Sequence, residues 1–283
     1  MPYIYKIATL NIKGITSNTK IQMLEEFLVK QDIDIALLQE VTNQHLHKIR
    51  RYTIYINEGT ERRGTAIVVK EGITLNDIKR IPSGRGIAAK FNGTWIVNIY
   101  APSGTEKKQE REHFYNSELT YILPMTYAEI ILAGDFNCIL TKTDSTGTKN
   151  YSRALANIVN GVGLIDAWEA TTTSGRYTHY TANGASRIDR IYATKEIMER
   201  KTGIQTTAAA FTDHNAVIMR ITIDTPPTRG RGYWRLNTAL MREKSHIDTL
   251  QEQWEKWRTH KKHYPNSVMW WDRYTKRMIK NYS

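Results

Sequence analysis

Polar side chains interrupt several apolar segments of the sequence where packing gives no reason for them. They occur in the motifs ATLNIKG, ALLQE, VNIYAPSG, ILAGDFN, SRIDRIY and FTDH, and they are Asn11, Glu40, Tyr100, Asp135, Asn137, Asp189, Asp213 and His214. A carboxylate at the end of a buried segment is unfavourable unless it is paired or bound to a cation. Repeated along the chain, the pattern predicts that the strand ends converge on one polar cluster.

These residue types together suit metal-assisted hydrolysis of a phosphodiester. Glu40 and Asp213 offer hard oxygen ligands for Mg²⁺, which typically takes one or two protein carboxylates. An aspartate beside a bound phosphate can orient or deprotonate water, and asparagine and histidine donors can stabilise charge that develops on phosphoryl oxygens. The single cysteine and the scattered histidines argue against a structural zinc site. We therefore expect Mg²⁺, or alternatively Mn²⁺, as the cofactor.

Strands and helices of ordinary length separate these motifs. Apolar alternation and continuous apolar runs predict strands at Tyr3–Ile12, Ile33–Val41, Thr65–Val69, Gly86–Phe91, Thr94–Tyr100, Glu129–Ala133, Tyr177–Thr181, Arg187–Ala193 and Ala216–Ile223. Apolar residues at helical spacing predict helices around residues 21–28, 106–123 and 151–159. Asn92-Gly93 and Asn183-Gly184 predict hairpin turns between neighbouring strands. The expected fold class is α/β, a two-layer β-sandwich flanked by helices.

The charge of the chain changes near residue 225, where the segment Thr225–Gly230 (TPPTRG) breaks the strand pattern. Residues 225–283 carry 13 Lys and Arg against 5 Asp and Glu, and five of the seven tryptophans, whereas residues 1–224 carry 27 against 23. We expect a domain at 1–224 and a basic, Trp-rich helical extension at 225–283. The net charge of +12 favours a polyanionic partner, because neutralising phosphates releases counterions.

Apolar residues in the extension fall on two helical stripes, which consist of Leu240, Ile247, Leu250, Trp254 and Trp257, and of Val268, Trp271 and Met278. Such stripes need a packing partner. We expect them to pack on the first domain or on each other and not to contact DNA directly. If the chain is a fragment, their partner instead lies in further sequence.

Composition also bears on the compartment. No apolar run approaches the roughly 20 residues that span a bilayer, and the first residues lack the pattern of a secretory signal. The single cysteine, Cys138, fits a reducing environment. We expect an intracellular protein without membrane association.

From about Tyr3 to Ile223, the order of these motifs resembles that of the endonuclease/exonuclease/phosphatase superfamily. The chain is most similar to the apurinic-type endonuclease domain of LINE-type non-LTR retrotransposon polyproteins, and SRIDRIY and GYWRLNTALM point to that branch. The resemblance implies a DNase I-like fold and an Mg²⁺-dependent endonuclease that nicks double-stranded DNA and leaves a 3′-hydroxyl. It also implies a reverse transcriptase region of the same polyprotein as a partner, and action in the nucleus.

The resemblance assigns metal-binding roles to three residues. Glu40 would be the principal ligand, Asn11 would lie close to the metal and the attacked phosphate, and Asp213 would lie near the metal. The family usually has serine before this aspartate, where the chain has Thr212. Both hydroxyl groups can form the same hydrogen bond, so we expect the site to be intact.

The family's remaining catalytic roles concern the phosphate and the attacking water. Tyr100 would contact the phosphate, and Asn137 would hold a phosphoryl oxygen. Asp135 would activate or align the water. Asp189 would orient His214, which would stabilise the transition state.

Two further residues are expected to contact the substrate, Arg187 in SRIDRIY and Asn183 in the preceding turn. The turn at residues 182–185 lies directly before the strand of Asp189. We hypothesise that it reaches into a DNA groove and influences the choice of site. An ordinary connecting turn is an equally good interpretation.

Three other functions remain open. A host apurinic/apyrimidinic repair endonuclease would use the same chemistry on abasic sites. A phosphatase or sphingomyelinase-like enzyme would act on lipid or small phosphoesters, and a catalytically silent protein would only bind DNA. The basic, Trp-rich extension favours the retrotransposon endonuclease over the repair enzyme.

Overall fold

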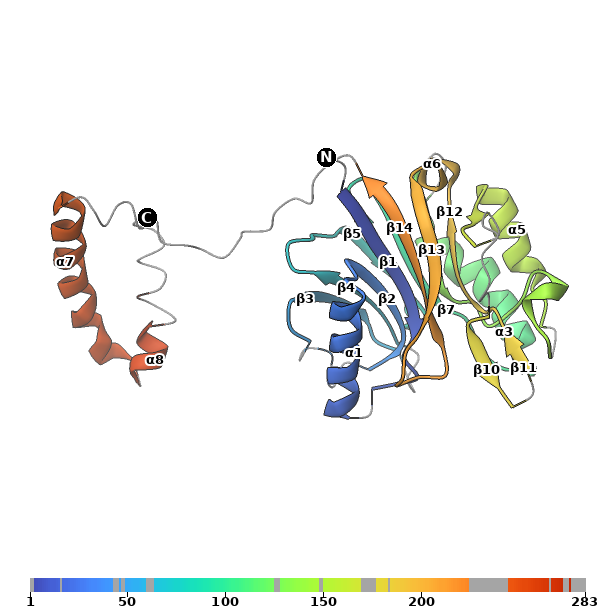
Figure 1. Cartoon of the computed structure of the whole chain (residues 1–283), viewed down its shortest axis with the longest axis horizontal. Helices are drawn as coiled ribbons and strands as arrows, with labels where there is room; N and C mark the ends of the chain where they lie inside the picture. Colours follow the sequence, from blue (N-terminus) through green and yellow to red (C-terminus); the bar gives the residue numbers. More distant parts are fainter. Residues whose placement is uncertain are drawn as a thin grey trace. The chain divides into compact units, whose positions relative to one another are not determined.

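Two six-stranded β-sheets pack face to face in the part of the chain that carries all six motifs (Figure 1). The first sheet has the order β13-β14-β1-β2-β4-β3, and the second has the order β5-β6-β7-β8-β12-β9. The strands of the first sheet are β1 (Tyr3–Asn11), β2 (Ile35–Val41), β3 (Tyr52–Asn57), β4 (Gly64–Lys70), β13 (Lys201–Ala208) and β14 (Asn215–Ile223). Those of the second are β5 (Asn76–Arg80), β6 (Gly86–Phe91), β7 (Thr94–Tyr100), β8 (Ile130–Asp135), β9 (Ile165–Asp166) and β12 (Asp189–Ala193). The expected two-layer α/β sandwich is confirmed.

The computed structural model describes residues 3–15, 17–42, 46, 49–59, 64–124, 128–147, 150–168, 177–182, 184–223, 244–264, 266–271 and 275. The chain divides into two units, Met1–Gly230 and Arg231–Ser283. The segment 225–230, where we expected a boundary, lies outside the described residues.

Each sheet contains one parallel pair of strands, and a helical connection joins the two strands of each pair. β1 and β2 are parallel and are joined through α1 (Asn18–Lys30), while β7 and β8 are parallel and are joined through the helical segment 108–122. All other strand pairs described in the two sheets are antiparallel. The carboxyl ends of β1, β2, β7 and β8 can therefore meet the amino ends of their antiparallel neighbours.

The hydrophobic core has three layers. Side chains from the inner faces of both sheets, such as Ile7, Leu37, Ile96 and Ile131, form the central layer. A second layer lies between the first sheet and α1, and a third lies between the second sheet and its helices (Figure 1). Apolar burial on both faces explains why the central strands are continuously apolar in sequence.

The predicted helices are found with changed ends. Ser17 caps α1, whose residues Ile21, Leu24, Phe27 and Leu28 are all buried as expected. The second helical segment consists of α3 (Lys108–His113), the π-helical η1 (Phe114–Leu119) and α4 (Thr120–Ile122). The third, α5 (Arg153–Val162), begins after its cap Ser152, which leaves Tyr151 outside the helix and exposed. A short helix, α6 (Lys195–Glu199), follows β12.

The second predicted hairpin differs from expectation. β10 (His179–Thr181) pairs with β11 (Gly184–Ser186), and not with the segment Arg187–Ala193. The strand β12 within that segment instead joins the second sheet, where it pairs with β8 and β9. The apolar residues of this segment therefore indicate burial on both faces of the second sheet, and not pairing with the preceding strand.

The smaller unit is helical in its described residues. It contains α7 (Lys244–Thr259), the short η4 (His260–His263) and α8 (Ser267–Trp270). Trp257 and Trp270 are buried, and the ring of Trp254 lies 5.7 Å from that of Trp270. These tryptophans therefore pack within the unit, while Leu240 and Met278 lie outside the described residues. In the described part of the chain, no helix combines the length and apolar character needed to cross a bilayer.

Candidate active site

The strand registers bring the motif residues of the second sheet to one edge. Tyr100 is the last residue of β7 and lies opposite Asp135, the last residue of β8. Asp135 in turn lies opposite Asp189, the first residue of β12. In the first sheet, Asn11 ends β1, and His214 directly precedes the antiparallel partner β14. The fold thus gathers residues that are widely separated in sequence.

Asn11 connects the polar groups of the two sheets. Its Nδ2 donates to Glu40 Oε1 at 2.9 Å and to Asp135 Oδ2 at 2.9 Å. The hydroxyl of Tyr100 donates to the same Glu40 oxygen at 3.1 Å. Burial and the charge of Glu40 raise the pKa of Tyr100, so the phenol stays protonated as a donor. One amide therefore places two carboxylates, one from each sheet, beside each other.

Unusual backbone conformations place two of these residues. Glu40 has a φ of 54° and Asn137 has a φ of 49°, both in the left-handed region that few non-glycine residues adopt. The register of β2 against β4 shifts between Gln39 and Val41, so Glu40 occupies a bulge that redirects its side chain. Such strain is typical of functional sites that the surrounding structure holds in place.

A buried polar pair supports Glu40 from behind. Gln39 donates through Nε2 to Thr9 Oγ1 at 3.0 Å and to Asn98 Oδ1 at 2.7 Å. Asn98 donates to the backbone oxygens of Leu38 and Ala66 at 2.9 and 2.8 Å. Gln39 and Asn98 are fully buried, and their hydrogen bonds link the two sheets directly beneath the bulge. This network fixes the backbone that presents Glu40.

Asp189 and His214 form a buried pair. His214 Nδ1 lies 2.9 Å from Asp189 Oδ2. Burial by itself would lower the pKa of His214, but the charge of Asp189 and their hydrogen bond outweigh it and raise the pKa to about 9. The imidazole is therefore cationic near neutral pH, and its Nε2–H is a charged donor.

Asp135 lies against this pair and against Asn137. Burial and the nearby charge of Asp189 raise the pKa of Asp135 above its usual range. The backbone N–H of Asn137 donates to Asp135 Oδ1 at 3.0 Å, and the Asn137 amide donates to the carbonyl of Ala101 at 2.9 Å. A carboxylate whose pKa is raised toward neutral pH is suited to act as a general base.

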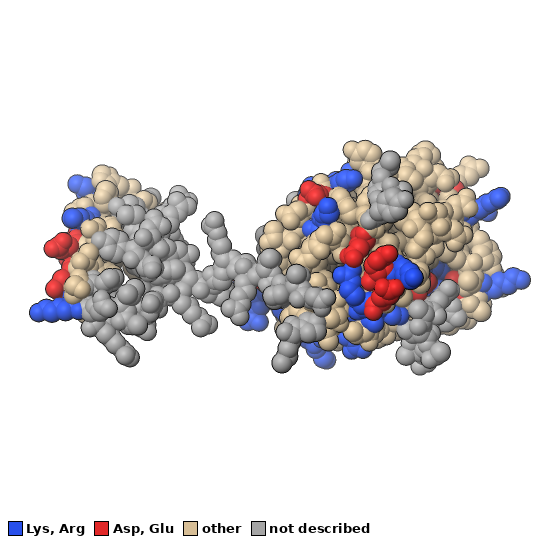
Figure 2. All heavy atoms as spheres, turned by 90° about the horizontal axis from the view of Figure 1, so that it is seen from above, with Lys and Arg blue, Asp and Glu red and all other residues tan. Residues whose placement is uncertain are grey.

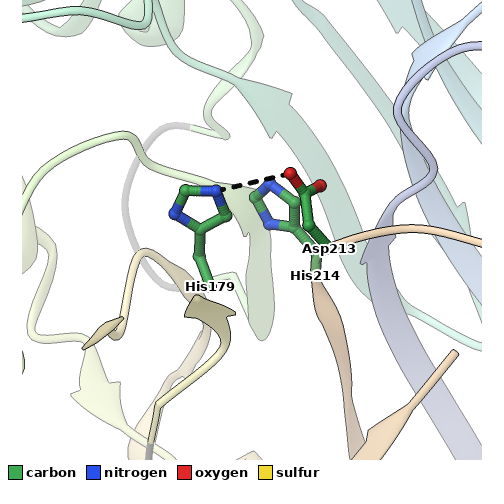
Figure 3. Close-up of side chains that lie close together, drawn as sticks. All are labelled: His179, Asp213 and His214. Atoms are coloured by element: carbon green, nitrogen blue, oxygen red, sulfur yellow. Dashed lines mark ion pairs between the residues drawn. The ribbon is translucent and has the colours of Figure 1, made fainter. Parts of the chain in front are cut away.

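Asp213, which precedes His214, lies beside a lysine and a second histidine. Lys13 Nζ donates to Asp213 Oδ2 at 2.7 Å, and His179 Nε2 lies 3.8 Å from the same oxygen (Figure 3). Burial would raise the pKa of Asp213, but the hydrogen bond from Lys13 lowers it overall. Thr212, next to it, donates through Oγ1 to the backbone oxygen of Asn11 at 2.9 Å. The threonine hydroxyl thus ties this loop to the end of β1.

The donor set fits a hard divalent cation. Within the described part of the chain, Asp189 Oδ1 and Asp213 Oδ1 are buried and accept no hydrogen bond. Ligand atoms of Asp135, Asp189 and His214 lie within 4.8 Å of one another, as do those of His179, Asp213 and His214. The carboxylate of Glu40 lies at the end of a third strand and is joined to this cluster by its hydrogen bond from Asn11. Excess buried negative charge with unpaired oxygens favours the binding of a cation.

Of the two expected substrate contacts, one is buried and the other lies outside the described residues. Arg187 is buried, and its guanidinium pairs with Asp144 at 2.9 Å and with Asp166 at 2.6 Å. Its charge is therefore used inside the protein, which corrects the expectation that it contacts the substrate. Asn183 lies outside the described residues.

Three residues near the cluster were not predicted from the sequence as part of the site. They are Lys13, Thr178 and His179, of which Lys13 belongs to the motif ATLNIKG. The ring of His179 packs on that of His214, with centroids 4.5 Å apart. A small cavity of about 260 Å³ adjoins His179 and Asn137. The sequence signal for Thr178 and His179 was their place in the predicted strand Tyr177–Thr181.

Comparisons with known proteins agree with this architecture. A transposon TX1 uncharacterized 149 kDa protein of Xenopus laevis is 28% identical over 186 residues, which cover 62% of this chain and 14% of that protein. The structure of an AP endonuclease from Archaeoglobus fulgidus matches with a TM-score of 0.64 at 23% sequence identity. The match covers 76% of this chain and 98% of the endonuclease chain. The endonuclease domain of TRAS1, a telomere-specific non-LTR retrotransposon, matches with a TM-score of 0.58 at 16% sequence identity. The match covers 79% of this chain and 100% of the TRAS1 domain.

These structural similarities confirm the DNase I-like fold. The family description Endonuclease/Exonuclease/phosphatase matches residues 8–214, which include all the motif residues from Asn11 to His214. The chain therefore belongs to the endonuclease/exonuclease/phosphatase family.

Proposed function

We propose that this protein is a Mg²⁺-dependent endonuclease that hydrolyses one phosphodiester of double-stranded DNA and leaves a nick with a 3′-hydroxyl. The observation that carries the proposal is the amide of Asn11, which joins Glu40 and Asp135 across the two sheets beside the Asp189–His214 pair. That arrangement supplies a cation site, a base and a cationic donor in one place.

The metal-binding roles fall to Glu40, Asn11 and Asp213. Glu40 is the principal ligand, and Asn11 orients it. When bound, Mg²⁺ supplies positive charge next to the scissile phosphate. Mn²⁺ has the same preference for oxygen ligands and should substitute for it.

The chain's own residues move the protons and hold the phosphate. Asp135 accepts a proton from the attacking water, whose oxygen bonds to phosphorus. Asn137 donates a hydrogen bond to a phosphoryl oxygen, Tyr100 contacts the phosphate, and His214 donates through its Nε2–H to the developing negative charge. The P–O3′ bond then breaks, the leaving O3′ gains a proton from solvent water, and the phosphate stays on the 5′ end of the downstream strand.

We further propose that the domain nicks target DNA for a non-LTR retrotransposon polyprotein, acts in the nucleus, and works with a reverse transcriptase region of that polyprotein. The similarity to the Xenopus laevis transposon protein and the basic charge support this assignment. The alternative is a host repair endonuclease for apurinic/apyrimidinic sites, which the fold accommodates equally well.

The test is a nicking assay on supercoiled plasmid with the full chain. We expect open circles with Mg²⁺, none with EDTA, and a loss of about 10³-fold or more for Asp135→Ala, because removing the base removes a major part of the rate. DNA binding by Asp135→Ala should survive. Extension of the nick by a DNA polymerase reports a free 3′-hydroxyl.

The same preparation separates the two assignments. Cleavage of an oligonucleotide with one abasic site much faster than intact plasmid would favour the repair enzyme. Binding without cleavage under all conditions would instead identify a silent DNA-binding protein and refute the proposed function.

A further inference from the structure

Two neighbouring residues, Thr178 and His179, contact both members of the Asp189–His214 pair. His179 is the first residue of β10 and Thr178 directly precedes it, and both lie outside the six motifs. Their contacts reach the backbone of one member and the ring of the other, so the pair is held from a third segment of the chain.

Thr178 fixes the backbone around Asp189. Its buried Oγ1 accepts hydrogen bonds from the backbone N–H groups of Ile188 and Asp189 at 3.3 and 3.1 Å. The carbonyl of Thr178 accepts from the N–H of Asn215 at 2.7 Å, directly after His214. One residue thus ties the start of β12 to the start of β14.

His179 fixes the imidazole ring itself. The two rings lie 4.5 Å apart at an interplanar angle of 34°, and a β-bridge joins their backbones. The flat face of the His179 ring therefore packs against the His214 imidazole. Such stacking restricts the rotation of His214 about its side-chain bonds.

Resting on the proposed function, we propose that Thr178 and His179 are positioning residues that hold the Asp189–His214 pair in its working geometry. Thr178 acts through its hydroxyl and His179 through the flat face of its ring. The position of the β10–β11 hairpin therefore determines the direction in which the Nε2–H of His214 points. Neither residue needs to touch the substrate.

Two matched pairs of variants in the full chain test this. Thr178→Ser keeps the hydroxyl and Thr178→Val removes it at nearly constant volume; His179→Phe keeps a flat ring and His179→Ala removes it. We expect kcat for nicking to fall about 10-fold to 100-fold in T178V and H179A, since a displacement of about 1 Å can cost that much. KM should change by less than about threefold, and T178S and H179F should retain most of the rate.

A second readout does not depend on activity. The NMR signal of the His214 Nδ1 proton in metal-free protein reports its bond to Asp189, and it should persist in T178S and H179F but broaden in T178V and H179A. Tyr180→Ala serves as the control, because Tyr180 lies on the exposed side of the same strand. Thermal melts of each variant separate loss of the fold from loss of geometry, and the pair T178S/T178V remains informative if H179A unfolds.

Several results would overturn the inference. Unchanged kcat in T178V and H179A would show that the pair needs no such support. Equal losses in H179F and H179A, with an intact His214 signal, would show that His179 acts through its nitrogen. An inactive wild-type chain would instead refute the proposed function, so the two failures are distinguishable.

Discussion

At the scale of single residues, the site depends on how one buried positive charge balances several negative ones. His214 keeps its proton because Asp189 lies 2.9 Å from its Nδ1, and Asp135 binds protons more readily because it is buried beside the same Asp189. A bound cation would stabilise the ionised form of Asp135 and lower its pKa. The cluster therefore combines negative charge that suits a cation with donors that suit a phosphate.

Replacing Asp189 with Asn should lower the pKa of His214 well below 9, because burial alone disfavours the charged ring. In the wild type, the pair's contribution to stability is complete below the ordinary pKa of 6.5 and is lost as pH rises through about 9. An NMR titration of the His214 ring in metal-free protein measures the change. An unaltered pKa in Asp189→Asn would show that Asp189 is not its main partner.

At the scale of elements, burial determines which strands could be predicted from the sequence. The strands predicted from apolar patterns, such as β2 and β7, are central and buried on both faces. The strands β3, β5 and β13 were not predicted, and all three lie at sheet edges, where one side meets solvent and polar residues are common.

The candidate site shows the same limit. The eight motif residues could be predicted because they break apolar segments, and the structure brings them to one end of the sandwich. The bulge that presents Glu40 could not be predicted, since a positive φ at a glutamate leaves no mark in the sequence. The stacking of His179 on His214 depends on a bridge between segments 35 residues apart, which local patterns do not encode.

The loop after β8 also depends on a buried ion network. Asp144 accepts from Arg187 at 2.9 Å and from Arg190 at 3.0 Å, and all three side chains are buried. Burial would raise the pKa of Asp144, but the two arginines lower it below its usual range. The network anchors this loop to β12, directly behind Asp189.

Asp144→Asn should therefore lower the free energy of unfolding by about 3–5 kcal/mol, because it leaves buried arginine charge uncompensated. Urea unfolding at neutral pH measures the loss. Glu199→Gln removes an exposed pair with Lys195 and should change stability by less than about 1 kcal/mol. Equal, small effects of both substitutions would contradict the role of the network.

At the scale of the whole molecule, charge is unevenly distributed along the chain. The net +12 comes largely from residues 225–283. Figure 2, by contrast, shows Asp and Glu side chains gathered beside Lys and Arg on one face of the larger unit. The smaller unit is therefore the main source of unbalanced positive charge, which favours contact with the DNA backbone.

Removal of residues 225–283 should make DNA binding less dependent on salt without abolishing nicking, because fewer phosphate contacts release fewer counterions. Affinity measured over a series of salt concentrations, for the full and shortened chains, gives the two slopes. Equal slopes would exclude phosphate contacts by this region.

We infer that residues from both sheets hold one hydrated cation, and Mn²⁺ binding followed by electron paramagnetic resonance tests this inference. Glu40→Gln keeps the oxygen that accepts from Asn11 and Tyr100 but removes the charge, so affinity should fall by about tenfold or more. Glu26→Gln, exposed on α1, is the control and should bind as the wild type does. If Glu40→Gln binds Mn²⁺ as tightly as the wild type, the cation does not lie at this cluster, which contradicts the proposed metal site.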